Sequence, residues 1–308
     1  MTISYAQLKI RQAYDLDMKI TMSQQKIREW YNYWCGQVYV SFSGGKDSTV
    51  LLHLVRELYP DVPAVFVDTG LEYPEIRDFV KTFDNVTWLK PKMNFKAVIE
   101  KYGYPVVSKR IAQYVHEVRH SKSVTATVVL RLTGYRDGGR KMSPSSRISQ
   151  KWLGLIKAPF DTSDKCCDVM KKEPFGRFVK ESGRYPINGV RAEEGERRQQ
   201  TYCTYGCNAF GLNEPRSTPL AFWLDKDIND YFKEKVIPWA KVYDMGYKRT
   251  GCMFCMFGCH LEGSPNRFQR MKETHPKQWK YCMDVLGLRE VLKFIGVDPE
   301  PRKYFWEK

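Results

Sequence analysis

The sequence predicts an α/β protein in which a parallel sheet is covered by helices on both faces, a doubly wound arrangement. Short apolar runs alternate with helix-like segments along the first hundred residues. Each run is apolar at successive positions, as expected for a strand that is buried on both faces of a sheet. The turns after the first two runs are polar and glycine-containing, and they fall where a parallel sheet binds its ligands.

The predicted elements follow one another in a regular order. The segment 5–34 has apolar positions at helical spacing and contains no proline. The run at 64–67 is β-branched and lies between Pro63 and Asp68-Thr69-Gly70, which bound it as a strand. We expect helices over 5–34, 48–58, 75–83 and 94–102, and strands over 38–42, 64–67 and 86–89.

Composition excludes several classes of protein. Of the 308 residues, 43% are hydrophobic, which is enough for a buried core and excludes wholesale disorder. No stretch approaches the ~18 consecutive apolar residues of a membrane-spanning helix. The first residues lack an apolar signal core behind a basic start, so we expect a cytoplasmic location and no membrane partner. Nine cysteines in such a protein are expected to be metal ligands or reactive thiols rather than disulfides.

Positive charge is concentrated in one segment. The net charge is +15, and residues 106–157 hold eleven Lys or Arg against two acidic residues. Such a field attracts polyanions. Aromatic side chains that could stack on bases are interleaved with these charges, namely Tyr114, His116, Tyr135 and Trp152. We therefore expect nucleic acid as a partner, DNA before RNA, although a solvated basic loop is the alternative.

A glycine-rich loop lies between the first predicted strand and its helix, with the sequence SFSGGKDS at 41–48. Gly44 and Gly45 allow a tight turn whose N–H groups form a nest for phosphate, and the following helix adds its N-terminal partial charge. Lys46 supplies a point charge, and Asp47 is suited to hold Mg²⁺. The loop matches neither GxxxxGK[ST] nor GxGxxG, and an ordinary turn is the alternative.

This loop resembles that of the N-type ATP pyrophosphatases, which split ATP between the α and β phosphates. The segment Asp68-Thr69-Gly70 with Tyr73-Pro74-Glu75 is similar to the DTG-x-x-[FY]-P-E segment of the phosphoadenosine phosphosulfate (PAPS) reductase family. The resemblance implies an adenine nucleotide alpha hydrolase-like sheet that binds ATP and Mg²⁺. It also implies which residues contact the nucleotide: Ser41, Ser43, Gly44, Gly45, Lys46, Asp47, Ser48 and Asp68.

Four cysteines stand in two pairs. Cys166 and Cys167 are adjacent, and Cys252-x-x-Cys255 follows 85 positions later. Adjacent side chains diverge, which suits a single zinc ion poorly, whereas a cubane cluster has ligand positions on different irons. The context resembles the [4Fe–4S] assimilatory reductases, and this resemblance implies that the four cysteines hold such a cluster. Zinc and buried structural thiols are the alternatives.

A third segment, from Asn188 to Arg197, is similar to the family's G-x-R-x-x-E-S-x-x-R, with Gly195 in place of the serine. The resemblance implies that Arg191 and Arg197 face the anionic group of the substrate and act in catalysis with Lys46 and Asp47. A solvated charged helix is the alternative. The segment from Thr218 to Tyr231 also resembles the family, and we expect packing and helix capping from it rather than chemistry.

The other cysteines carry weaker signals. Cys203 and Cys207 would share a face if they were helical and could relay sulfur as a persulfide, or they are structural. Cys259 is the better candidate for a reactive thiol near the cluster. Cys35 and Cys282 are expected in the core.

Three segments are expected along the chain. A helical segment occupies 1–36, and a nucleotide-binding domain with the basic insertion 106–157 occupies 37–245. A cysteine-rich helical region over 246–308 completes the iron–sulfur site.

Two departures from the assimilatory reductases guide the functional hypothesis. Residues 301–308 lack the family's E-C-G-[IL]-H nucleophile, and SGGKDS is intact. Together with the charge, they indicate an ATP pyrophosphatase that activates a substrate for sulfur transfer to nucleic acid, as in the DndC-like or SspD-like proteins of DNA phosphorothioation. A sulfur donor such as a cysteine desulfurase is then expected. The alternatives are an APS or PAPS reductase that releases sulfite and a nonenzymatic nucleic-acid-binding defence partner.

Overall fold

The computed structural model describes residues 3–136 and 139–300, and the chain forms two compact units. Unit 1 is built from Met1–Asp68, Glu72–Lys90 and Pro174–Thr250, and unit 2 from Thr69–Leu71, Pro91–Glu173 and Gly251–Lys308. Every helix in the described part of the chain is too short or too polar to cross a bilayer. The tail 301–308, which lacks the reductase nucleophile in sequence, lies outside the described residues.

These units divide the chain differently from the three expected segments. The N-terminal helices belong to unit 1, because Leu8, Ile27 and Trp30 are fully buried there. The basic stretch 106–157 belongs to unit 2, together with the cysteine-rich region. Strand pairing within unit 2 accounts for this grouping, because Val106–Val107, which comes before 174–250 in the chain, pairs with Met256–Phe257, which comes after it.

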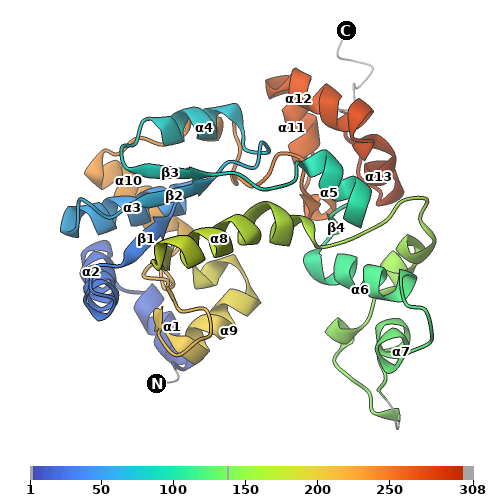
Figure 1. Cartoon of the computed structure of the whole chain (residues 1–308), viewed down its shortest axis with the longest axis horizontal. Coiled ribbons are helices and arrows are strands. Elements are labelled where there is room, and N and C mark those ends of the chain that lie inside the picture. The colour runs from blue at the N-terminus through green and yellow to red at the C-terminus, as the bar shows by residue number, and fades with distance from the viewer. Residues whose placement is uncertain (1–2, 137–138, 301–308) are drawn as a thin grey trace. The chain divides into compact units, whose positions relative to one another are not determined.

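Unit 1 contains a six-stranded, mostly parallel sheet (Figure 1). The strand order is β3-β2-β1-β5-β7-β6, and only β6 runs antiparallel to its neighbour. The strands are β1 (Val38–Ser41), β2 (Ala64–Val67), β3 (Val86–Leu89), β5 (Tyr185–Asn188), β6 (Asn208–Ala209) and β7 (Arg216–Ser217). Because β1 pairs with β2 on one side and β5 on the other, the strand order reverses at β1. The predicted fold class is therefore confirmed.

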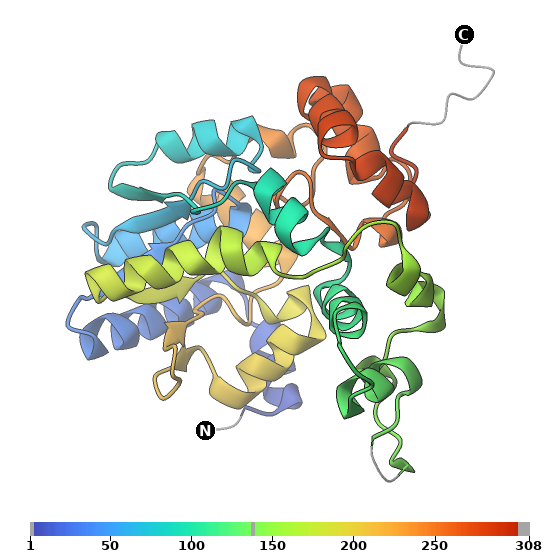
Figure 2. The ribbon, with the colours of Figure 1, turned by 45° about the vertical axis from the view of Figure 1, so that its right-hand side comes forward.

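Helices cover both faces of this sheet. The aromatic ring of Tyr39 in β1 packs against Phe175 and Phe178 of α8, which lies along the near side of the sheet in Figures 1 and 2. Val38 and Val40 point to the other face, since side chains alternate along a strand. The helices are α1 (Tyr5–Gln12), α2 (Leu16–Tyr33), α3 (Lys46–Leu58), α4 (Pro74–Lys81), α8 (Glu173–Ser182), α9 (Glu196–Tyr205) and α10 (Asp225–Lys235).

The single helix expected over 5–34 is in fact two helices. The Asp15 carboxylate accepts the N–H of Met18 and caps the start of α2. Such a cap favours a new helix start over continuation of the preceding helix. The segment from Thr218 to Tyr231 packs and caps as expected, because Asp227 accepts the N–H of Leu224 at the start of α10.

Unit 2 is mostly helical and is held by short strand pairings. Strand β4 (Val106–Val107) pairs in parallel with β8 (Met256–Phe257). Its helices are α5 (Phe95–Tyr102), α6 (Lys109–Arg119), α7 (Ala126–Thr133), α11 (Arg267–Thr274), α12 (Pro276–Lys280) and α13 (Leu288–Phe294). Thus the C-terminal part of the described chain is helical and contains cysteines, as predicted.

Candidate nucleotide site and cysteine cluster

The glycine-rich loop lies where the sheet reverses its strand order. Residues 42–45 connect β1 to α3, and β5 lies beside β1, so the loops that follow these two strands are neighbours. A Cβ built on Gly189, just after β5, would lie 3.1 Å from the backbone of Asp47 and Ser48. This position, beyond the carboxyl ends of the central strands, is where open α/β sheets bind ligands.

Gly44 gives the loop its shape. Its φ of +70° lies in the left-handed region, which glycine adopts without strain. A Cβ on this residue would lie 2.9 Å from methyl groups of Ile76 and Val80 on α4. Any side chain would therefore displace the loop from α4.

The two loop serines hold the turn together. The Ser48 hydroxyl accepts the N–H of Ser43 at 3.1 Å and donates to the Gly45 carbonyl at 2.9 Å. The N–H of Gly45 donates to the Ser43 hydroxyl at 3.3 Å. Ser48 is buried, whereas Ser43 is exposed. The structure thus gives Ser48 an internal role, and phosphate contact by either serine remains a prediction.

Lys46 begins α3 and is surrounded by aromatic rings. Its backbone N–H donates to the Tyr243 hydroxyl at 2.9 Å, and its ammonium lies 3.1 Å from the Asn229 side-chain oxygen. The ammonium also lies 4.6 Å from the ring centroid of Trp239 and 4.9 Å from that of Tyr243. Sequence reasoning missed Trp239 and Tyr243, because no local pattern connects them to the loop.

Arg191 is buried and bonded to three carboxylates. Its guanidinium contacts Asp47 at 2.6 Å, Glu193 at 2.7 Å and also Asp225. Burial raises the pKa of Asp47, the effect of Arg191 opposes this rise, and Asp225 adds to it. Arg191 therefore fixes the position of Asp47, and direct contact between Arg191 and a substrate anion remains a prediction.

Arg198 is a second arginine with charge interactions at this site, and contact between Arg197 and a substrate anion remains a prediction. Arg197 and Arg198 are both exposed on α9, and Arg198 also forms an ion pair with Glu194. Burial lowers the pKa of Arg198, and the neighbouring positive charges of Arg249 and Arg191 lower it further, while Asp47 raises it. Arg198 therefore lies close to Asp47 and to two other cations. Counting along G-x-R-x-x-E-S-x-x-R from Gly189 also leads to Arg198, so the family pattern already contained this signal.

The other predicted nucleotide contacts lie at strand ends. Ser41 is the last residue of β1 and pairs in register with Val65 and Asn188. Asp68 follows β2, is buried, and accepts a hydrogen bond from Arg77 at 2.9 Å. Both positions lie at the carboxyl edge of the sheet, as the loop does.

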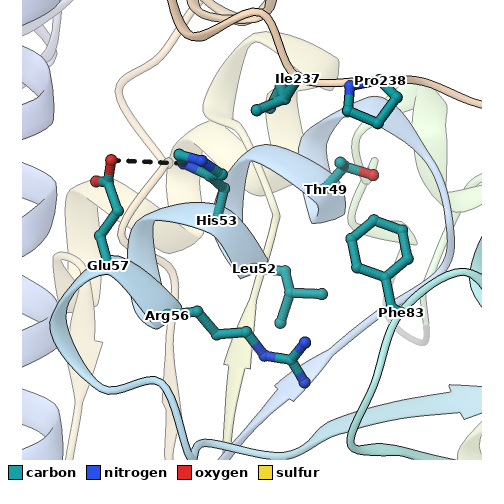
Figure 3. Close-up of a pocket in the computed structure, with 8 residues that line it drawn as sticks. All are labelled: Thr49, Leu52, His53, Arg56, Glu57, Phe83, Ile237 and Pro238. Carbon is teal, nitrogen blue, oxygen red and sulfur yellow. Dashed lines mark ion pairs between the residues drawn. The ribbon is translucent and has the colours of Figure 1, made fainter.

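A cavity of about 360 Å³ lies along α3, beyond its first turn. Figure 3 shows Ile237 and Pro238 on one side of it and Phe83 facing them. His53, at its polar end, lies 2.8 Å from the Tyr231 hydroxyl and 3.6 Å from the Glu57 carboxylate. The remaining lining residues are Thr49, Leu52 and Arg56. None of the site residues predicted from the sequence lines this cavity.

The two cysteine pairs are both in unit 2, and strand pairing brings their neighbourhoods together. Val106–Val107 pairs with Met256–Phe257, and Tyr104, two residues earlier in the chain, pairs with Thr162. Cys166 and Cys167 follow Thr162 by a few residues, and Cys252 and Cys255 immediately precede Met256. Two regions that are distant in sequence therefore meet across one short stretch of chain.

Electrostatics also shows that the four thiols are close. The pKa of Cys166 is raised first by its hydrogen bond to Cys167, then by burial and by Cys167, Cys255 and Cys252. The Cys166 thiol donates to the Cys167 sulfur across 4.0 Å, which lowers the pKa of Cys167 to about 6, aided by Lys109 and Lys171. Burial raises the pKa of Cys255, opposed in part by Arg267.

The four thiols are compatible with the ligand set of a four-iron cluster. Across residues 3–136 and 139–300, no three His, Cys, Asp or Glu side chains are arranged to hold one metal ion. A four-iron cluster takes each thiolate on a different iron, so its ligands need not converge on one point. Four neighbouring thiols with Lys109, Lys171 and Arg267 close by also match the negative charge of such a cluster.

The remaining cysteines differ in their surroundings. Cys259 is buried and donates to the Met256 carbonyl, and burial raises its pKa to about 12, which disfavours a reactive thiolate. Cys282 lies in the core as predicted, but Cys35 is exposed in the turn after α2, so the expectation of a core position was wrong for it. Cys203 lies on α9, whereas Cys207 lies beyond Gly206 and outside the helix, so they share no helix face.

The basic stretch 106–157 has many exposed Lys and Arg side chains, but fewer of its aromatic rings are accessible to bases than expected. Tyr114 is buried and covered by the Arg131 guanidinium at 3.6 Å from its ring centroid, so it is not available to a base. Trp152 and His116 are partly buried, and Tyr135 is exposed. Tyr135 pairs with Lys141 in a narrow hairpin that also carries Arg136 and Arg140. The exposed basic residues are Lys109, Arg110, Lys122, Arg136, Arg140, Lys141, Arg147, Lys151 and Lys157.

Comparison with known proteins agrees with the motifs. The family model described as the phosphoadenosine phosphosulfate reductase domain matches residues 37–137 and 109–257. The uncharacterized protein MJ0973 of Methanocaldococcus jannaschii is 28% identical over 274 residues, covering 86% of this chain and 50% of that protein. MJ0066 of the same organism is 24% identical, covering 81% of this chain and 41% of that protein. The chain thus spans half or less of the length of these two relatives.

Two further relatives have named activities. The adenosine 5'-phosphosulfate reductase of Geobacillus kaustophilus is 23% identical over 225 residues, covering 73% of this chain and 75% of the enzyme. A crystal structure of PAPS reductase from Candida auris aligns with a TM-score of 0.45 and 16% identity, covering 82% of this chain and 97% of that chain.

Proposed function

Because the chain belongs to the phosphoadenosine phosphosulfate reductase domain family, we propose that it is an ATP pyrophosphatase that activates nucleic acid for sulfur transfer. The observation that carries this proposal is the intact SGGKDS loop at the carboxyl edge of the sheet, with Lys46 at the start of α3. The loop and the helix N-terminus offer N–H donors and a cation to a polyphosphate. A whole-protein activity like that of the DndC-like or SspD-like proteins is part of the same proposal.

In the first step, an oxygen of the acceptor attacks the α-phosphorus of ATP. A bond forms between that oxygen and phosphorus, the α–β bridging bond breaks, and pyrophosphate leaves with its electrons. Lys46 and the loop N–H groups stabilise the charge that develops on the leaving group. Asp47, held in place by Arg191 at 2.6 Å, is the residue that would bind the Mg²⁺ of the Mg·ATP substrate.

In the second step, sulfur at the oxidation level of hydrosulfide displaces AMP. A bond from sulfur to the activated atom forms, the bond to the acceptor oxygen breaks, and this oxygen leaves with AMP. A proton is lost from sulfur, and no external oxidant or reductant is consumed. Arg198, which interacts with Asp47 of the loop, and Arg249, which interacts with Arg198, are suited to hold the AMP phosphate.

Cys166, Cys167, Cys252 and Cys255 are the residues that would hold a [4Fe–4S] cluster. When bound, the cluster would supply a thiophilic, redox-active metal centre in unit 2. Lys109, Lys171 and Arg267 would balance its charge, because they already lower the pKa of Cys167 or Cys255. A cysteine desulfurase would supply the sulfur as a persulfide, and a thiol or another two-electron reductant must cleave this persulfide to release the hydrosulfide that the second step consumes.

Nucleic acid is the proposed acceptor because unit 2 exposes nine Lys or Arg between residues 109 and 157. The hairpin with Tyr135, Arg136, Arg140 and Lys141 combines cations with an exposed ring. Such combinations bind single-stranded or distorted nucleic acid by charge and stacking. We propose DNA before RNA.

A second candidate is reduction of adenosine 5'-phosphosulfate to sulfite and AMP. It is favoured by the relatives that carry this name, at 21–23% identity over about three quarters of this chain. That reaction needs a nucleophilic thiol and two electrons. Among the described cysteines, Cys259 is a poor nucleophile because burial raises its pKa.

The decisive experiment measures two products under anaerobic conditions. Pyrophosphate release from Mg·ATP is followed with and without DNA, beside sulfite release from APS and PAPS. We expect pyrophosphate from the wild type, stimulation by DNA, and loss of release in Lys46→Ala. The exposed Lys180→Ala on α8 is the matched control. Sulfite release without cleavage of ATP would reject the proposal in favour of the reductase.

A further inference from the structure

The segment from Val236 to Thr250 covers the phosphate-binding loop within unit 1. The Tyr243 hydroxyl accepts the backbone N–H of Lys46 at 2.9 Å and lies 3.0 Å from the Thr250 hydroxyl. A Cβ built on Gly45 would lie 3.0 Å from the Thr250 hydroxyl and 3.4 Å from that of Tyr243. The Tyr243 hydroxyl therefore occupies the mouth of the loop, where a phosphate oxygen would accept the same Lys46 N–H, and the Thr250 hydroxyl lies beside it.

The same segment also engages the loop's cation. The Lys46 ammonium lies over the rings of Trp239 and Tyr243, at 4.6 and 4.9 Å from their centroids. Trp239 is itself fixed by its indole N–H, which donates to Asp244 at 2.9 Å. A nucleotide phosphate that pairs with this ammonium competes with the two rings, because the cation–π contact and the ion pair use the same charged group.

The segment begins at a strained residue. Val236 has a φ of +51°, a left-handed conformation that is unfavourable for a β-branched side chain. Its side chain is 85% exposed, so packing does not compensate for the strain. Strained residues of this kind are found at switch segments and clamps. Val236 is also the left-handed C-cap residue of α10, so the segment leaves the helix at this point, which we take as its pivot.

Empty space lies beside the residues that follow this pivot. Ile237 and Pro238 line the 360 Å³ cavity and face Thr49 and Phe83 across it (Figure 3). A close-packed interior resists displacement of a segment, whereas a cavity provides room for it. Ile237 is half-buried and Pro238 is exposed, so these two residues can shift into the cavity, whereas Ala240 and Val242 are buried and have to move together with the residues that pack on them.

From these contacts we infer that Val236–Thr250 is a latch that competes with nucleotide for the phosphate-binding loop. Tyr243 occupies the mouth of the loop, with Thr250 beside it, until phosphate displaces them, and the segment then pivots about Val236. The latch rests on the proposed function only in taking an adenine nucleotide as the ligand. Only molecules with a free loop bind the nucleotide. The apparent association constant is therefore the intrinsic constant multiplied by the fraction of molecules in which the loop is free.

The first test measures binding of α,β-methylene-ATP with Mg²⁺ by calorimetry, since this analogue is not cleaved between the α and β phosphates. Tyr243→Phe removes the competing oxygen and keeps the ring over Lys46. We expect it to bind about two- to tenfold more tightly than the wild type, as loss of one neutral hydrogen bond predicts. Tyr33→Phe, at an exposed tyrosine of α2, is the control and should bind like the wild type. Unchanged or weaker binding by Tyr243→Phe overturns the latch.

The second test measures amide hydrogen exchange in peptides that cover 236–250. With the analogue bound, exchange in this segment should rise, while that of β1 and β5 stays constant. Slower or unchanged exchange in 236–250 means that the segment closes on the nucleotide or stays in place, and it overturns the latch.

Failure of the latch and failure of the proposed function have different signatures. If Tyr243→Phe leaves the affinity unchanged while ATP still yields pyrophosphate, only the latch is wrong. If the variant binds the analogue more tightly but no pyrophosphate is released, the latch stands and the pyrophosphatase proposal fails. Absence of binding in both proteins rejects both.

Discussion

Replacement of Lys19 by methionine should destabilise the protein strongly, because it breaks an ion pair that is buried between α2 and α10. The Lys19 ammonium lies 2.6 Å from the Asp227 carboxylate, and the two side chains are 1% and 10% exposed. Lys19 also donates to the Gln12 carbonyl at 2.8 Å. At an effective dielectric constant of about 20, two unit charges at this distance attract by about 6 kcal/mol.

Part of this attraction offsets the cost of burying the lysine, which the substitution removes. We therefore expect Lys19→Met to lower the free energy of unfolding by about 3–5 kcal/mol, the range for a buried charge left without its partner. In this variant Asp227 still accepts the N–H of Leu224, but no cation balances its charge at the Lys19 position. The double variant Lys19→Met/Asp227→Asn should recover a large part of the loss, because neither charge of the pair then remains.

The assay is urea denaturation followed by tryptophan fluorescence. Trp223 reports on the region, because its indole N–H donates to Ser23 of α2 at 2.9 Å. Lys26→Met removes the more exposed Lys26–Glu29 pair and should change the free energy of unfolding by less than about 1 kcal/mol. If Lys19→Met lowers the free energy of unfolding by less than about 1 kcal/mol while the m value for urea is unchanged, the reasoning is refuted.

Three further predictions concern the loop, the cysteines and the basic hairpin. Gly44→Ala should lower the free energy of unfolding by more than about 1 kcal/mol and abolish calorimetric binding of α,β-methylene-ATP, because its Cβ would lie 2.9 Å from Ile76 and Val80. Binding at wild-type affinity would contradict the role given to Gly44 in shaping the loop. Cys167→Ser should reduce the iron and sulfide content of anaerobically purified protein to background, whereas Cys282→Ser should leave it unchanged; equal contents would argue against the four-cysteine site. Joint replacement of Arg136, Arg140 and Lys141 by glutamine should reduce the slope of log affinity for DNA against log salt by about 0.9 for each phosphate that the hairpin no longer neutralises. An unchanged slope would show that the hairpin does not contact DNA phosphates.

Local patterns predicted the regular part of the fold. The runs at 64–67 and 86–89 are strands with the expected limits, because each is apolar, β-branched and bounded by turn residues. The loop at 41–48 was placed correctly between a strand and a helix for the same reason. The helix break at Asp15 was missed, since a single capping side chain outweighed a continuous helical pattern.

The environment of the candidate site was much harder to predict. Tyr243 lies 197 positions from Lys46, and Asp225 lies 34 positions from Arg191, so no local pattern connects them. Burial of Tyr114 under Arg131 and exposure of Cys35 also depend on tertiary packing. Residue type indicates which groups can react, but distance and burial decide which of them are available.

The order of strands in unit 1 has a consequence for its synthesis. Val38 in β1 pairs with Tyr185 in β5, so the two central strands are 147 positions apart. At about 5–20 residues per second, the ribosome needs roughly 7–30 s to add the intervening chain. During that interval β1 presents an open edge, which favours pairing with other chains. Nascent chains that stop before β5 are therefore expected to be the most aggregation-prone products of this sequence.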